Sequence, residues 1–168
     1  MLNQSLKVSV RNARPADAGE IAEVFRDSWR LAYTGILPSP HLEREIMRRD
    51  ANWWRRAIST EQNLLVALHG ETIAGYATCG RARGAGRDVG EIYELYLAPV
   101  YQGLGIGEHL FEACRATLDG LDLERLIVWA LEGNDRARAF YTRCGGRPTR
   151  RSCFRFGKAL SARIAFEW

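Results

Sequence analysis

The sequence feature that most constrains the fold is a run of six residues, Gln102–Gly107, in which three glycines alternate with apolar residues. The apolar segment 92–97 precedes it and reads as a strand, and segment 108–118 follows with apolar residues at helical spacing. The glycines therefore connect a strand to the start of a helix. Glycine lets backbone N–H groups turn freely, and a helix N-terminus adds unpaired donors and partial positive charge. The run predicts an anion site, most naturally for a phosphate or pyrophosphate.

Three phosphate-binding motifs compete for this loop. A Walker A loop requires Gly-Lys-Ser/Thr at its end, whereas here the last glycine is followed by Glu108. A dinucleotide fingerprint GxGxxG counted from Gly103 also fails at Glu108. The third motif, Gln-x-x-Gly-x-Gly, fits at Gln102, Gly105 and Gly107. In these residues the chain resembles the acetyl-CoA pyrophosphate loop of the GCN5-related N-acetyltransferase (GNAT) superfamily, although six residues alone also fit a simple glycine-rich turn.

A second motif lies after the apolar run 126–131, which reads as a buried strand. Asn134 is a favoured helix N-cap, and Gly145 stands where a left-handed C-cap is expected. The segment between them, Asn-x-x-Ala-x-x-Phe-Tyr-x-x-x-Gly, resembles the second signature of the same superfamily, with Tyr141 as its tyrosine. The resemblance covers roughly residues 8–168 and is densest over 91–145. The family usually places an aromatic residue after the helix-ending glycine, whereas this chain has Gly146.

Length and composition favour one soluble domain of an ordinary kind. A chain of 168 residues predicts a single domain over 1–168, and the resemblance implies that it is an N-acetyltransferase domain. It lacks an apolar run of membrane-spanning length and a signal-peptide pattern, so we expect a cytoplasmic protein with reduced thiols. The formal net charge of +4 suits a polyanionic ligand such as CoA, or simply solubility. Neither a metal site nor a disulfide framework is expected, because the cysteines are scattered, at Cys79, Cys114, Cys144 and Cys153.

The pattern of the whole chain predicts a mixed α/β (α+β) fold in the order β-α-α-β-β-β-α-β-α-β-β. The expected strands lie at 8–11, 63–68, 72–81, 91–97, 126–131, 147–156 and 162–168, and the expected helices lie between 17 and 35 and over 41–58, 108–118 and 135–144. The resemblance implies the acyl-CoA acyltransferase version of this class. In that version a central, mostly antiparallel sheet is flanked by helices, and its fourth and fifth strands splay apart to admit the cofactor.

The resemblance also implies acetyl-CoA as cosubstrate and assigns residues to it. Asn134 matches the residue that bonds the pantetheine arm, although it could act as an N-cap alone. Tyr141 matches the tyrosine near the CoA sulfur, and a phenol with pKa about 10 can donate a proton to the leaving thiolate. A packed aromatic is the alternative for Tyr141. The remaining cofactor-binding positions act mainly through the main chain: Leu95, Tyr96, Leu97, Gln102, Gly103, Leu104, Gly105, Ile106 and Gly107.

The implied reaction, acyl transfer from a thioester to an amine, needs a route for the amine proton. A lysine-like amine is only about 0.1 % neutral near pH 7.4, so about 4 kcal/mol of deprotonation must be supplied. Glu91 is the candidate base, because it precedes the loop by the spacing of the catalytic glutamate in the histone-acetylating branch. An ideal strand places Glu91 with Leu95 and Leu97 on one face and Glu94 on the other. Glu94, a water chain or two plain surface carboxylates stay open as alternatives.

The acceptor is not specified by the sequence. By resemblance it contacts the first helices and loop 81–90, which makes Trp29 and Tyr33 the candidate substrate-binding residues. Aminoglycosides, polyamines, amino acids and protein N-termini all stay open as amine substrates, and so does a homodimer. A CoA-binding sensor without turnover is the first rival function. A nucleic-acid binder is the second, but we expect no nucleic-acid or membrane partner, because no recognition motif accompanies the basic residues Arg147, Arg150, Arg151, Arg155 and Lys158.

Overall fold

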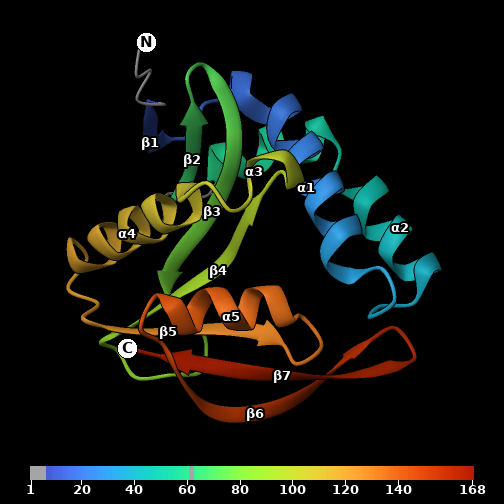
Figure 1. Cartoon of the computed structure of the whole chain (residues 1–168), viewed down its shortest axis with the longest axis vertical. Coiled ribbons are helices and arrows are strands. Elements are labelled where there is room, and N and C mark those ends of the chain that lie inside the picture. The colour runs from blue at the N-terminus through green and yellow to red at the C-terminus, as the bar shows by residue number, and fades with distance from the viewer. Residues whose placement is uncertain (1–6, 61–62) are drawn as a thin grey trace.

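The computed structural model describes residues 7–60 and 63–168, and within them a seven-stranded sheet is flanked by helices (Figure 1). The element order matches the sequence expectation except that one expected helix is two. In chain order the elements are β1 (Val8–Asn12), α1 (Ala18–Tyr33), α2 (Ser39–Arg48), α3 (Ala51–Thr60), β2 (Leu64–His69), β3 (Thr72–Arg81), β4 (Val89–Leu97), α4 (Ile106–Asp119), β5 (Arg125–Leu131), α5 (Asp135–Arg143), β6 (Arg147–Phe156) and β7 (Ala159–Glu167). None of the helices in these ranges is long and apolar enough to cross a bilayer.

The sheet has the strand order β1-β2-β3-β4-β5-β7-β6, and every neighbouring pair is antiparallel except β4 with β5. The parallel pair is short: only Val89–Glu91 of β4 meets Arg125–Ile127 of β5. Beyond this contact the two strands diverge, as Figure 1 shows. The expected antiparallel sheet with splayed fourth and fifth strands is therefore confirmed.

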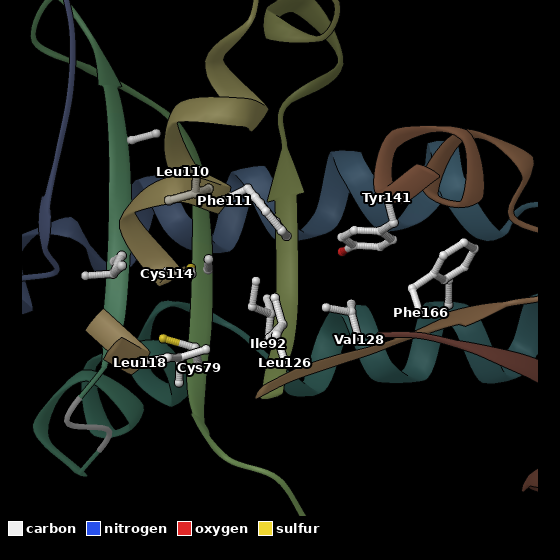
Figure 2. Close-up of a cluster of buried hydrophobic side chains, with 14 of the residues drawn as sticks. Cys79, Ile92, Leu110, Phe111, Cys114, Leu118, Leu126, Val128, Tyr141 and Phe166 are labelled. Carbon is white, nitrogen blue, oxygen red and sulfur yellow. The ribbon is translucent and has the colours of Figure 1, made fainter. Parts of the chain in front are cut away.

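Two large hydrophobic clusters cover the two faces of the sheet, and a third, small one includes residues of β4, β5 and β7. The cluster under α4 and α5 includes Leu110, Cys114 and Leu118 of α4, and Figure 2 shows it packed against the strands. The cluster under α1, α2 and α3 is rich in aromatic rings, among them Phe25 and Trp54. Each of these five side chains is at most 1 % exposed, so burial on both faces fixes the sheet between its helices.

The predicted single helix over 41–58 is wrong, because the chain forms α2 and α3 with a break at Arg49 and Asp50. Arg49 leaves the helical conformation with φ −95° and ψ 56°. The Asp50 carboxylate then accepts a hydrogen bond from the Trp53 N–H at 2.8 Å, as an N-cap does. Aspartate in a helical pattern thus ends one helix and begins another, and the break turns Arg49 towards the sheet.

The prediction of which residues of β4 share a face is also wrong. The register between β3 and β4 moves from Thr78–Glu94 to Cys79–Ile92, so β4 carries one extra residue at this point, a β-bulge. As a result Ile92 and Leu95 both pack into the α4 cluster although three positions separate them. The alternation then places Glu91 on the same face as Glu94, towards α1–α3, and opposite to Leu95.

Candidate active site

A cavity of about 650 Å³ lies where β4 and β5 diverge. It is bounded by the glycine loop and the start of α4 at one end, by the last residues of β4 and one side of α5 along its length, and by the second half of α1 at the other end. Its walls are formed by Ser28, Leu31, Ala32, Leu95, Tyr96, Leu97, Gln102, Gly103, Gly105, Gly107, Glu108, Asn134, Arg136, Ala137, Ala139, Phe140, Tyr141 and Arg143. Most residues of both sequence motifs therefore meet in one place.

The glycine loop adopts the conformation that its sequence predicts. Gly103 has φ 75° and Gly105 has φ 78°, a left-handed backbone that other residues adopt only with strain. A Cβ on either glycine would meet no atom of the described residues within 4 Å, whereas a Cβ on Gly107 would lie 3.0 Å from Phe140. Gly105 is the N-cap residue of α4, so the free N–H groups of that helix begin at the cavity. The loop thus offers an open backbone cradle with room for a phosphate group.

Two arginines beside the glycine loop were not predicted as site residues from the sequence. Arg136 donates a hydrogen bond at 3.0 Å to Gln102, whose amide donates in turn to the Leu97 carbonyl at 3.2 Å. Arg143 lies 4.0 Å from Glu108. Both arginines line the cavity from α5, seven positions apart on one helical face, and this spacing was the signal that could have revealed them. Their charges suit a polyanion and offset the carboxylate of Glu108 at the helix start.

The end of β4 presents an open strand edge to the cavity. Beyond Glu91 the edge that faces β5 has no pairing strand among residues 7–60 and 63–168, yet Leu95, Tyr96 and Leu97 line the cavity. Unpaired backbone groups on such an edge can bond an extended, amide-containing ligand as a further strand would. The geometry suits the amides of a pantetheine arm.

Asn134 occupies the predicted helix start. Its side-chain oxygen accepts a hydrogen bond from the Ala137 N–H at 3.2 Å, so it caps α5 while it lines the cavity. At the other end of this helix Gly145 has φ 89°, as expected for a left-handed C-cap. Both predicted ends of the helix are confirmed, and the amide nitrogen of Asn134 is left for another partner.

Tyr141 projects from α5 into the space between the diverging strands. Figure 2 shows its hydroxyl directed towards β4, and its ring packs near Phe166 at 5.9 Å between centroids. Burial raises the pKa of this phenol above its usual range, so it holds its proton near neutral pH. Within the described ranges no protein atom hydrogen-bonds its hydroxyl. The proton of Tyr141 is therefore available to a ligand.

The unusual Gly146 is explained by the end of the chain. Trp168 lies against this glycine so closely that a Cβ there would approach its indole to 2.5 Å. The indole N–H donates to the Cys144 carbonyl at 2.8 Å, and the ring lies 5.2 Å from Phe111 and 6.2 Å from Tyr141. Trp168 thus lies where a side chain at position 146 would project, and its ring packs beside Phe111 and Tyr141.

The two candidate bases lie outside the cavity wall. Glu91 accepts a hydrogen bond from the Arg83 N–H at 3.2 Å; burial raises the pKa of its carboxyl, and this bond offsets part of the rise. Glu94 forms an ion pair with Arg49 at 2.5 Å and accepts a bond from the Tyr76 hydroxyl at 3.3 Å. Neither carboxylate lines the cavity, so either could receive a proton from there only through intervening groups or water.

The remaining predicted site residues differ in how deeply their side chains are buried. Trp29 and Tyr33 belong to the aromatic core under α1–α3, where they are 7 % and 8 % exposed. Tyr33 still reaches the site, because its hydroxyl lies 2.6 Å from that of Tyr96. Leu104 projects into solvent, and Ile106 is buried in the core, so neither side chain lines the cavity. Within the described ranges no group of three or more His, Cys, Asp or Glu residues is placed to hold a metal ion.

Comparison with known proteins agrees with this geometry. Residues 21–146 match the model of the Acetyltransferase (GNAT) family. An uncharacterized N-acetyltransferase of Bacillus subtilis, YuaI, is 30% identical over 130 residues, which are 76% of this chain and 73% of the relative. An uncharacterized N-acetyltransferase of Mycobacterium tuberculosis, Rv2669, is 29% identical over 143 residues, which are 84% of this chain and 90% of that one.

Solved structures share the fold at lower identity. The PaiA N-acetyltransferase of Thermoplasma acidophilum, crystallised in complex with coenzyme A, superposes with a TM-score of 0.78 at 19% identity and covers 96% of this chain and 99% of its own. The ribosomal-protein-alanine N-acetyltransferase of Brucella melitensis gives a TM-score of 0.70 at 20% identity, with 95% of this chain and 98% of its own covered. These likenesses confirm the fold expected from the sequence.

Proposed function

Because the chain belongs to the Acetyltransferase (GNAT) family, we propose that it transfers an acetyl group from acetyl-CoA directly to a primary amine of a small molecule or a peptide. The observation that carries this proposal is the cavity, which joins the glycine loop, the open edge of β4 and the hydroxyl of Tyr141. A binding module needs only the first two of these features. A proton donor beside them favours turnover.

The residues present fit acetyl-CoA, which supplies the acetyl thioester when it is bound. The N–H groups at Gly105 and Gly107 would hold the pyrophosphate, with Arg136 and Arg143 adding positive charge. The edge of β4 at Leu95–Leu97 would bond the pantetheine amides, with Asn134 opposite as the N-cap of α5. The acidic Glu108 at the helix start is an unfavourable group, and Arg143 lies near enough to offset it.

The chemistry proposed for the protein concerns two protons. Tyr141 donates its phenolic proton where a thiolate leaves, because burial keeps this phenol protonated and its hydroxyl has no competing bond from the described residues. The backbone N–H of Leu95 is the proposed donor to the developing oxyanion. The amine proton leaves through water towards Glu91, whose carboxyl burial makes a better base than a free glutamate.

The test is acetyl-CoA binding by calorimetry followed by a thiol-release assay with a panel of amines. The panel contains an aminoglycoside (kanamycin), a polyamine (spermidine), free amino acids and a peptide with N-terminal alanine. We expect binding and acetylation of at least one member. Binding without release for every member would overturn the proposed transfer and favour a CoA-binding sensor. Absence of binding would overturn the cofactor assignment.

A further inference from the structure

The acceptor end of the cavity contains a hydroxyl pair that the proposed chemistry leaves unused. The phenolic oxygens of Tyr33 and Tyr96 lie 2.6 Å apart although 63 positions separate the residues in the chain. Tyr96 lines the cavity, and Tyr33 ends α1, the helix whose second half forms the far wall of the cavity. Trp29 stands edge-on to the Tyr33 ring at 5.0 Å between centroids and holds it in place. The pair therefore joins α1 to β4 beside the cavity, at the end that we assign to the acceptor.

Either hydroxyl of the pair can donate to the other across the 2.6 Å contact. Burial raises the pKa of Tyr33 to about 12, so this phenol keeps its proton. In the arrangement in which Tyr96 donates to Tyr33, the lone pairs of the Tyr96 oxygen remain for another donor.

Neither hydroxyl can serve as a base. Burial raises the pKa of Tyr96 well above its ordinary value, so both phenols stay neutral at physiological pH. A neutral phenolic oxygen whose proton is already used acts as a hydrogen-bond acceptor only. Such an oxygen can accept a hydrogen bond from an N–H group of a ligand, but it cannot donate one to a ligand that offers only lone pairs.

We propose that the Tyr96 oxygen accepts an N–H of the acceptor amine and that Tyr33 is a positioning residue, which keeps the Tyr96 proton turned away. This inference rests on the proposed acetyltransfer. The hydrogen bond orients the nitrogen so that its lone pair faces the thioester carbon between Leu95 and Tyr141. The amine proton still leaves to water, and the hydroxyl pair stays neutral throughout.

The experiment measures steady-state kinetics with the best amine from the acceptor panel, for Tyr96→Phe, Tyr33→Phe and the double variant. Loss of one hydrogen bond predicts that kcat/KM for the amine falls about tenfold in Tyr96→Phe, with the KM for acetyl-CoA unchanged. In Tyr33→Phe it should fall about three- to tenfold, because the Tyr96 proton is then free to turn towards the amine. The double variant should equal Tyr96→Phe alone, since Tyr33 acts only through Tyr96.

The matched control is Tyr76→Phe, which removes a third buried hydroxyl of the same aromatic cluster, one that does not line the cavity. Its kcat/KM should stay within about twofold of the native protein. Effects that multiply in the double variant, or an unchanged kcat/KM in Tyr96→Phe, would overturn the inference while acetyltransfer stands. If Tyr96→Phe does not fold, Tyr33→Phe decides alone: a loss of amine kcat/KM of about threefold or more supports the pair, and native kinetics reject it.

Discussion

The two ends of the cavity are built in different ways. The loop end consists of one continuous stretch, in which backbone N–H groups and left-handed glycines form the surface. The acceptor end consists of side chains from α1, β4 and α5, brought together only by the completed fold. The comparison teaches that a backbone site can be recognised from spacing alone, whereas a side-chain site depends on long-range packing.

The two ends also differ in charge. Arg136, Arg143 and Glu108 stand around the loop, where a polyanion is expected. The acceptor end presents hydroxyl and amide groups, and the ion pair of Arg49 with Glu94 lies behind the tyrosines. In the function that we propose, charge at the loop end serves cofactor binding, and neutral hydrogen bonds at the other end orient the acceptor.

The largest expected effect concerns the residue between the two ends. Tyr141→Phe keeps the ring and most packing but removes the proton donor. General acid catalysis is typically worth about 10²–10⁴-fold, so we expect kcat to fall within that range while acetyl-CoA affinity changes little. Steady-state kinetics and calorimetry check this together. A near-native kcat would leave Tyr141 as packing only, and a joint loss of rate and binding would place it in the cofactor site instead.

A smaller effect tests the loop end. Gly105→Asp adds a carboxylate and strains a left-handed position, so the acetyl-CoA-induced rise in melting temperature should disappear. That rise corresponds to about 2.7 kcal/mol when the ligand exceeds its Kd about a hundredfold. Gly70→Asp is the matched control, because Gly70 has φ 63° and open space in the β2–β3 turn. The control should lose stability but keep the shift, and a shift retained by Gly105→Asp would remove the phosphate assignment.

The smallest effect tests whether the acceptor end depends on packing. Arg49 lies over the Trp53 ring at 4.8 Å and bonds Glu94, and both charged side chains are mostly buried. Arg49→Met leaves Glu94 without that partner, so the free energy of unfolding in urea should fall by about 1–3 kcal/mol. The exposed Arg48 pairs with Glu45 and is the control: Arg48→Met should cost less than about 0.5 kcal/mol. Equal losses in the two variants would contradict this distinction.

Much of the glycine loop and of α5 could be predicted because the determinants of both are local. The glycine spacing, the N-cap at Asn134 and the C-cap at Gly145 each follow from the preferences of a few neighbouring residues. The element order, apart from the split into α2 and α3, followed from periodicity, and the splayed strands followed from the family resemblance. Arg136 and Arg143 were missed, although their spacing of seven positions places them on one face of the helix.

Tyr33, Tyr96 and Asn134 were expected at the site, but the contacts of α1 and β4 could not be predicted, for equally physical reasons. A β-bulge leaves no mark in an apolar alternation, so the ideal strand pattern put Glu91 and Glu94 on opposite faces of β4. The break at Asp50 looked like one polar position within a longer helix. The Tyr33–Tyr96 contact joins residues that no local rule connects. Each of these features depends on which surfaces meet after folding.

The packing of Trp168 against Gly146 couples two distant positions, so the side chain allowed at one depends on the side chain at the other. A large side chain at 146 would collide with the indole, and a small one at 168 would leave a gap beside Phe111 and Tyr141. Either replacement alone should therefore cost stability, whereas a matched exchange of a large and a small side chain can preserve the packed volume. We expect the two positions to vary together among related proteins.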